Sequence, residues 1–218
     1  MSAAENAGRE RILARIRSAL QTAAPRHENV TEGGPIFAPV DDPIARFERE
    51  CVANSTELMS VPNACEAEEA LRALLASLPS GEIYVQDAPL LRRVLGNMRD
   101  ERAVRWSNSG APSESSQATI TEAECLVASS GSILIASSAA GRGASVVAPV
   151  HIVVAGEAQL VPDLASALAR SRERGLTERN SALFLITGSS RTADIEKILV
   201  LGAHGPRRLV VILVHHLD

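Results

Sequence analysis

The chain has few aromatic residues, a small negative net charge and no long apolar run. Phenylalanine, tryptophan and tyrosine make up 2% of its 218 residues, so few rings are present on which nucleic-acid bases could stack. The net charge of −4 is opposite in sign to the basic surface of a nucleic-acid-binding domain. No apolar run approaches the roughly 20 residues that span a bilayer. We therefore expect neither nucleic-acid nor membrane partners.

Cysteine is also scarce, and the three residues, Cys51, Cys65 and Cys125, lie far apart without a C-x-x-C pair. That spacing favours neither a zinc ribbon nor an iron–sulfur cluster, which usually needs about four thiolates. An odd number of cysteines without an apolar signal segment indicates reduced thiols. We expect a cytoplasmic protein with no metal site or cofactor of its own.

Apolar residues make up 45% of the chain, which is enough for one large domain. The N-terminal part differs from the rest. Ile12, Ile16 and Leu20 are spaced as in an amphipathic helix, and residues 21–42 are polar with several prolines and glycines. We predict a helix and linker arm over residues 1–42 and an α/β domain over residues 43–218. The helix either docks a partner or packs on the domain body, and we favour the second.

Strand-like and helical segments alternate through the first half of residues 43–218. Asp42 before Pro43 is typical of a helix N-cap, and Asn63 with Glu66 three residues later is a capping-box variant. Strands that alternate with helices favour a largely parallel sheet.

The second half of the domain has a different pattern. "SILIAS" (132–137) and "HIVVAG" (151–156) are both strand-like, and no helical pattern separates them. Since a parallel pair usually needs a helical crossover, we expect these two strands to be antiparallel neighbours in one mixed sheet. "ALFLI" (182–186) should be a parallel strand of the same sheet.

A polar turn, "TGSSRTADIE", follows "ALFLI". Gly188 can adopt the positive φ that such a turn often needs. Thr192 and Asp194 suit the N-cap and first turn of a helix, and the free amides of a helix N-terminus commonly bind anions. The turn is either a plain loop or half of a ligand site. In the second interpretation three further side chains contact the ligand: Ser189, Ser190 and Arg191.

A second serine cluster, "ASSGS", contains Ser129, Ser130 and Gly131. It does not match G-x-S-x-G, so ligand binding is favoured over a hydrolase nucleophile. If "SILIAS" runs antiparallel to its neighbours, this cluster lies at the same edge of the sheet as Ser190, and the two clusters line one pocket.

Arginine and histidine supply the remaining candidates. Arg142 lies in "GRGASV", an incomplete dinucleotide fingerprint, and is either a carboxylate clamp or a solvated loop residue. The five histidines lack metal-ligand spacing, and His151 and His204 are expected to be structural.

Three stretches together resemble the LUD-domain family, specifically the C-type subunit of lactate-utilisation proteins: "AECLVASSGSILIAS", "APVHIVVAGEAQLVPDL" and "TGSSRTADIEKILVLGAHGPRRLVVIL". Their most specific part joins S-x-T-A-D-I-E to G-x-H-G-P-R-R within residues 190–208. The resemblance implies a three-layer α/β/α sandwich with a mixed sheet, similar to ribose-5-phosphate isomerase, glucosamine-6-phosphate deaminase and CoA transferases.

The resemblance also implies a part in the oxidation of L-lactate to pyruvate, beside companion subunits that carry iron–sulfur clusters. This chain would bind a small anionic ligand, a carboxylate or acyl compound. Two alternatives stay open: a stand-alone isomerase- or transferase-like enzyme on sugar phosphates or acyl-CoA, and a non-catalytic assembly subunit. Many relatives have E-T-G where this chain has Ser129 to Gly131, so Glu124 is the nearest substitute acid and a further candidate.

Overall fold

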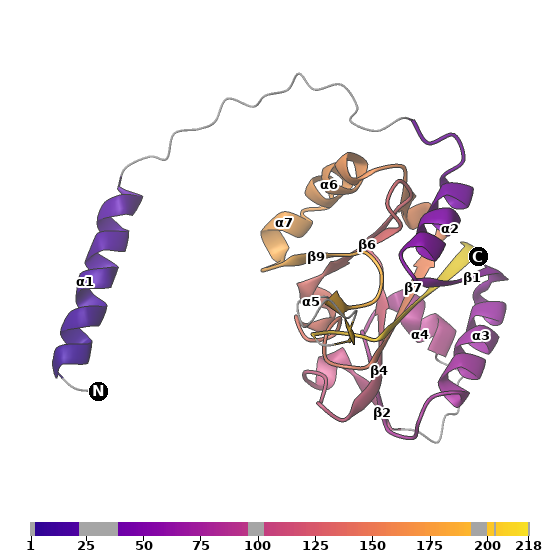
Figure 1. Cartoon of the computed structure of the whole chain (residues 1–218), viewed down its shortest axis with the longest axis horizontal. Helices are drawn as coiled ribbons and strands as arrows, with labels where there is room; N and C mark the ends of the chain where they lie inside the picture. The colour runs from indigo at the N-terminus through magenta and orange to yellow at the C-terminus, as the bar shows by residue number, and fades with distance from the viewer. Residues whose placement is uncertain (1–2, 22–38, 96–102, 193–199, 203, 218) are drawn as a thin grey trace. The chain divides into compact units, whose positions relative to one another are not determined.

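The computed structural model describes residues 3–21, 39–95, 103–192, 200–202 and 204–217 (Figure 1). The chain divides into two units, Met1–Ala38 and Pro39–Asp218. The first unit contains helix α1 (Ala3–Leu20), which covers the predicted amphipathic segment. The second unit contains every strand that the structure describes. No helix in the described ranges is both long and apolar enough to cross a membrane.

A six-stranded sheet forms the centre of the second unit, and each of its neighbouring strands is parallel to the next. β7 and β12 are apolar and buried on both faces, as is usual for strands inside a parallel sheet. In spatial order the strands are β1 (Glu57–Asn63), β12 (Arg208–His216), β7 (Val150–Gly156), β4 (Ser116–Glu122), β2 (Glu82–Val85) and β3 (Val104–Trp106).

Helices α3 (Ala64–Ala76) and α4 (Pro89–Leu95) cover one face of this sheet. Leu71 of α3 and Leu91 of α4 pack in one cluster with Ile212 of the sheet. The helix starts are those that the sequence predicts. The Asn63 side chain accepts hydrogen bonds from the first-turn amides of α3, and Asp42 accepts one from the first turn of α2 (Pro43–Ala53).

The other face is covered by α2 and by a second, four-stranded sheet. Phe47 of α2 and Ile133 of the small sheet pack in one cluster with Val211 of β12. Helix α6 (Leu164–Glu173) packs on the outer side of the small sheet, where Ala167 belongs to one buried cluster with Leu134. The strands of the small sheet are β8 (Leu160–Val161), β5 (Cys125–Val127), β6 (Ser132–Ala136) and β9 (Leu183–Ile186).

The α/β class is therefore confirmed, while the expected single mixed sheet between two helical layers is corrected. Figure 1 shows β6 and β9 between α6 and the strands labelled β7 and β4, so a second sheet occupies part of one helical layer. The large sheet is wholly parallel, and the mixed pairing occurs in the small one: β5 is parallel to β8, while β6 is antiparallel to β5 and β9.

The predicted pairing of "SILIAS" with "HIVVAG" is wrong for the same reason. These segments are β6 and β7, and they belong to different sheets. The crossover rule applies only to strands of one sheet, whereas β6 turns back tightly onto β5 and then pairs with β9. β9 is likewise antiparallel to its neighbour β6, not a parallel strand of the large sheet.

The helix predicted from Thr192 is corrected at its carboxyl end, where Val200 and Leu201 form a strand. Arg191–Thr192 form strand β10, which pairs antiparallel with β11 (Val200–Leu201). Asp194 and the rest of 193–199 lie outside the described residues. Thr192 is a strand residue. An N-cap residue also has an extended backbone, so the helix start and the anion site expected at this turn stay predictions. The remaining short elements are α5 (Ser137–Ala140), α7 (Leu176–Arg179) and the 3-10 turns η1 (Ser107–Ser109) and η2 (Glu157–Gln159).

Candidate functional site

A cavity of about 350 Å³ lies between β9 and the amino-terminal ends of β7 and β12. It brings together parts of the chain that are far apart in sequence. Its lining comprises residues 145–146, 151, 183–186, 188–190, 204–206 and 209. A second cavity of about 360 Å³ adjoins it and shares Val146, His204 and Gly205 with it.

His151, the second residue of β7, is the most deeply buried polar residue of the cavity wall. It is fully buried, and its Nε2 lies 2.9 Å from Thr121 Oγ1. In the described part of the chain its Nδ1 has no hydrogen-bond partner. Burial lowers the pKa of His151 to about 4, because the charged imidazolium cannot be solvated there. His151 is therefore a neutral hydrogen-bonding group at neutral pH.

Two threonines of β4 extend this buried polar surface. Thr119 and Thr121 are both fully buried, and Thr119 is the register partner of His151 across β4 and β7. Within the described residues, Thr119 Oγ1 also lacks a hydrogen-bond partner. Buried polar atoms are nearly always paired in proteins, so two unpaired atoms on adjacent strands make this the unusual part of the buried polar surface.

The sequence predicted a structural role for His151 and did not predict β4. The segment "SQATITE" is rich in polar residues and so did not look like a strand, although it forms one that is buried on both faces. Its β-branched run "TIT" is the signal that identifies it in retrospect.

The turn after β9 places Ser189 and Ser190 on the cavity wall. Gly188 adopts φ +81, and a Cβ there would lie 2.3 Å from the Asn54 carbonyl oxygen, so only glycine fits. The Ser190 amide donates to the Pro206 carbonyl at 2.9 Å, and the Ser190 carbonyl accepts from the Gly202 amide at 2.8 Å. These bonds join the two halves of the sequence motif in residues 190–208.

The first serine cluster lies at the same end of the β6–β9 pair as the second. Ser130 Oγ is 2.8 Å from Ser132 Oγ, which is 2.7 Å from Thr187 Oγ1. This is the proximity that the sequence predicts, although antiparallel pairing of β6 with β9 produces it. Ser129, Ser130 and Gly131 are nevertheless not among the residues that line the cavity.

Those three residues contact α2 instead. Arg46 donates to the Ser129 carbonyl at 3.3 Å, and Asn54 Nδ2 donates to the Ser130 carbonyl at 2.9 Å. Gly131 adopts φ +63, and a Cβ there would lie 2.9 Å from Glu50. The close approach of α2 explains why position 131 is a glycine.

The predicted arginines lie at opposite ends of β9. Arg191 is exposed next to the turn and donates from its guanidinium to the Asn54 carbonyl. Arg142 is exposed at the other end, where its Nε lies 3.4 Å from Ser181 Oγ. The geometry thus places Arg191, but not Arg142, beside Gly188 and the cavity wall.

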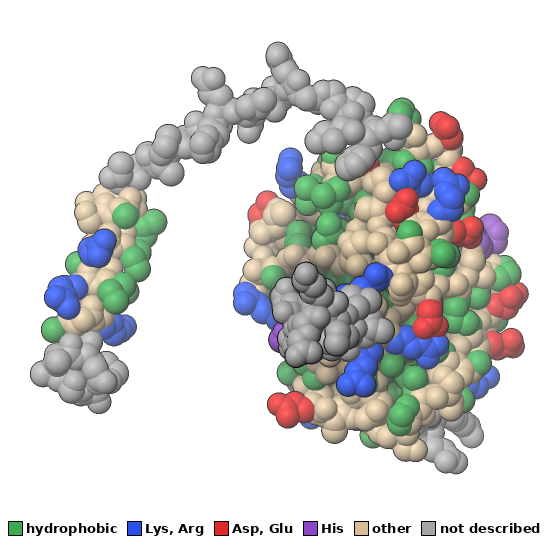
Figure 2. All heavy atoms as spheres, in the orientation of Figure 1, with side chains coloured by type: hydrophobic (Ala, Val, Ile, Leu, Met, Phe, Trp, Pro, Cys, Tyr) green, Lys and Arg blue, Asp and Glu red, His purple; other side chains and the backbone are tan. Residues whose placement is uncertain are grey.

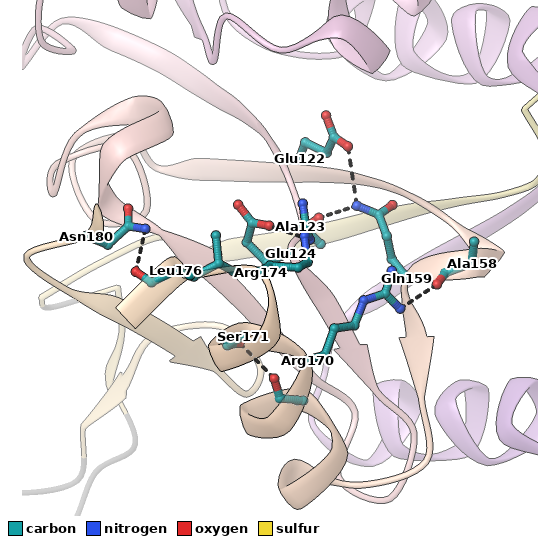
Figure 3. A network of polar contacts seen from close by, with 12 residues as sticks. Glu122, Ala123, Glu124, Ala158, Gln159, Arg170, Ser171, Arg174, Leu176 and Asn180 are labelled. Atoms are coloured by element: carbon teal, nitrogen blue, oxygen red, sulfur yellow. Dashed lines mark hydrogen bonds and ion pairs between the residues drawn. The ribbon is translucent and has the colours of Figure 1, made fainter. Parts of the chain in front are cut away.

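Glu124 belongs to a separate polar network at the carboxyl end of β4 (Figure 3). Its carboxylate lies 2.8 Å from the guanidinium of Arg174. Gln159 Nε2 donates to Glu122 at 3.3 Å and also to the Ala123 carbonyl. Burial, and then the neighbouring Glu124, raises the pKa of Glu122. The network joins β4, η2 and α6, and none of its members lines the cavity at His151.

The described lining of the two cavities contains one basic side chain and no acidic one. Among the described residues neither cavity is lined by Asp or Glu, while Arg207 lines the second one. On the face shown in Figure 2, described acidic and basic side chains are interspersed.

A sequence model of the LUD domain matches residues 44–214, which is most of the chain. The chain belongs to the LUD-domain family. This LUD-domain chain is 26% identical over 193 residues to Lactate utilization protein C of Bacillus subtilis, which covers 80% of this chain and 79% of that protein. It is 28% identical over 194 residues to the protein of the same name from Bacillus velezensis, again covering 80% and 79%.

Among solved structures, the LUD-domain chain is similar to the crystal structure of a DUF162 family protein from Deinococcus radiodurans. The TM-score is 0.61 at 21% identity, and the match covers 79% of this chain and 96% of that one. At this level of identity the similarity establishes a shared fold.

Proposed function

We propose that this LUD-domain chain is a component of lactate utilisation that binds a small carboxylate in the cavity beside His151. The observation that carries the proposal is the buried imidazole, whose Nδ1 has no partner among the described residues. A buried polar atom without a partner costs roughly 1–3 kcal/mol, and a ligand that hydrogen-bonds to it would offset that cost. The names of the relatives support lactate utilisation as the setting.

The cavity has the size of a site for a small acid, and it has both an apolar wall and a polar end. Its volume of about 350 Å³ lies near the lower end of the roughly 300–1,000 Å³ found for ligand pockets. Phe184, Ile186 and Leu209 supply an apolar wall, while Ser189 and Ser190 add polar groups at the turn. A compact molecule with one polar end and a short alkyl group suits this arrangement.

The surrounding charge favours an anion at the polar end. Arg191 lies beside Gly188, and Arg207 lines the adjoining cavity. With no acid in the described lining, a carboxylate meets attraction without a competing negative charge. Hydrogen bonds from arginine or serine to a carboxylate are among the stronger ones in proteins.

His151 supports a second polar group on the ligand. A neutral imidazole nitrogen donates or accepts according to the tautomer, so Nδ1 suits either a hydroxyl or a keto oxygen. A 2-hydroxy or 2-oxo acid has such an oxygen next to its carboxylate. L-Lactate and pyruvate are the small acids of this class that fit the family setting.

The proposal places the redox groups in companion subunits. Oxidation of lactate to pyruvate releases two electrons, and three scattered cysteines do not provide the four thiolates of a usual iron–sulfur cluster. This chain would contribute ligand binding, with iron–sulfur partners accepting the electrons.

A ligand screen tests the proposal, because a molecule that binds only the native state raises its melting temperature. L-Lactate, pyruvate, a CoA ester and a sugar phosphate are each added to the purified full chain, and hits are titrated by calorimetry. We expect lactate or pyruvate to bind. Ser190→Ala and His151→Gln should weaken binding at least about tenfold, as expected for loss of a hydrogen bond to a charged or buried group.

Ser129→Ala is the matched control, since Ser129 belongs to the other serine cluster and does not line the cavity. Its affinity should equal that of the wild type. A screen in which neither acid binds, or equal affinities in all variants, would count against the proposal. Binding of the sugar phosphate or CoA ester alone would favour the stand-alone enzyme.

A further inference from the structure

Ser60, His215 and Glu157 form a hydrogen-bonded row across three adjacent parallel strands. Ser60 is in β1, His215 is near the end of β12, and Glu157 directly follows β7. Ser60 Oγ lies 2.8 Å from His215 Nε2, and His215 Nδ1 lies 2.8 Å from Glu157 Oε2. A hydroxyl, an imidazole and a carboxylate are thus connected in the order found in serine hydrolases.

The chemistry of the three groups determines the direction of both hydrogen bonds. A carboxylate only accepts, so the proton between His215 and Glu157 is on Nδ1. In a neutral imidazole Nε2 then has the free lone pair and accepts from Ser60. The Ser60 proton therefore points at a base, and its oxygen is free to attack an electrophile.

The location suits a reaction centre. In open α/β sheets ligands bind beyond the carboxyl ends of the parallel strands, and these three residues lie toward that edge. Ser60 is exposed, so a substrate can reach its oxygen, while the His215 side chain is only 28% exposed and is held by its two partners. Glu157 directly follows β7 and is six residues beyond His151, which is near the start of that strand. Six residues of strand span roughly 20 Å, so the row lies well away from the cavity.

The strand that carries Ser60 also offers backbone donors. β1 is an edge strand of the six-stranded sheet in the described structure. Alternate N–H groups along such a strand point away from its single partner. Donors of this kind stabilise the oxyanion that forms when a hydroxyl attacks an acyl carbon.

We propose that Ser60 is the nucleophile of an acyl-transfer site, with His215 as its general base and Glu157 as the residue that positions the imidazole. Ser60 Oγ bonds to the acyl carbon of an ester as its proton moves to His215 Nε2. The ester C–O bond breaks, and the departing alcohol takes that proton. Water then attacks the acyl carbon and gives a proton to His215 Nε2. The bond from that carbon to Ser60 Oγ breaks, the serine oxygen takes the proton back, and a carboxylic acid is released.

The site favours a neutral ester. The hydrogen bonds and ion pairs of the three side chains involve only one another among the described residues. The row therefore brings the negative charge of Glu157 without a basic side chain to balance it, and a phosphate ester or other anion would be repelled. The proposal is independent of the cavity at His151.

Labelling with a neutral fluorophosphonate tests the proposal, because this reagent phosphonylates a base-activated serine and releases fluoride. The full chain is incubated with the probe, the rate is followed by intact mass, and the modified residue is located by peptide mass spectrometry. We expect one adduct per chain, on Ser60. Ser60→Ala should abolish it, and His215→Gln should slow it about 100-fold, the lower end of general-base contributions.

Ser109→Ala is the matched control, because Ser109 is exposed but donates only to a backbone carbonyl. It should label like the wild type. Glu157→Gln keeps a side chain of the same size and should slow labelling without changing the melting temperature by more than about 2 °C, since a half-exposed residue contributes little stability. An unlabelled wild type, an adduct at another residue, or an unchanged rate in His215→Gln overturns the assignment.

Discussion

The hydroxyl oxygens of Ser132 and Thr187 lie 2.7 Å apart and join the start of β6 to the end of β9. Through this contact the two serine clusters of the sequence lie at one end of the small sheet. Only the second cluster reaches the cavity at His151, while the first packs on α2.

Acid should destabilise the protein in part through His151. Its pKa is about 4 in the folded chain and about 6.5 in an unfolded one. The unfolded state therefore binds the proton first, so this residue's contribution is present above about pH 6.5 and is lost as the pH falls through 4. The 2.5-unit difference corresponds to about 3 kcal/mol.

Urea unfolding at pH 7 and pH 4, for wild type and for His151→Gln, isolates this contribution from that of the carboxyl groups. The free energy of unfolding should fall further in the wild type than in the variant. Equal losses in the two proteins would show that His151 does not titrate in this range.

Arg191→Ala should weaken binding of an anionic ligand without unfolding the domain. Arg191 is exposed and its guanidinium donates to the Asn54 carbonyl, so its loss should cost little stability, within about 1 kcal/mol. Losing a charge-assisted hydrogen bond to the ligand costs roughly 1.5–3 kcal/mol, or about 10- to 150-fold in affinity. Arg142→Ala, at the far end of β9, is the matched control in calorimetric titrations and should bind normally.

Gly188→Ala should be strongly destabilising, because the new Cβ would lie 2.3 Å from the backbone oxygen of Asn54. Gly175→Ala supplies the comparison. Gly175 also has a left-handed φ, +62, but its nearest contact would be an ordinary 3.6 Å. Chemical denaturation should give a loss of roughly 1 kcal/mol for Gly175→Ala, from backbone strain alone, and at least about 2 kcal/mol more for Gly188→Ala. Equal losses would mean that the turn can move away from Asn54.

Only one of the three thiols should react in the native protein. Cys65 is exposed, whereas Cys51 and Cys125 are buried. Burial raises the pKa of Cys51 to about 12 and also raises that of Cys125, so neither forms a thiolate at neutral pH. A colorimetric disulfide reagent should titrate one thiol per native chain and three after unfolding, and Cys65→Ser should remove the native signal. A fast second thiol in the native state would contradict this burial.

Local features of the domain were predictable because they depend on a few neighbouring residues. Asp42 and Asn63 cap α2 and α3 as expected, since a cap needs only a side chain and the amides two or three positions later. The apolar runs of β7 and β12 likewise predicted buried strands. The motif of residues 190–208 indicated the family that the LUD-domain match confirms.

Sheet membership and the sites were decided by tertiary structure. Whether β6 joins the large sheet or pairs with β5 and β9 depends on which surfaces bury the most apolar area, and no short window of sequence contains that information. In the sequence His151 looks like any histidine in a strand. Its hydrogen bond to Thr121 and its place in the cavity wall with the turn at Gly188 depend on distant segments. Ser60, Glu157 and His215 are likewise separated by 97 and 58 positions. The sequence by itself determined the caps, the buried strands and the family, whereas the pairing of distant strands alone brought these groups within hydrogen-bonding distance.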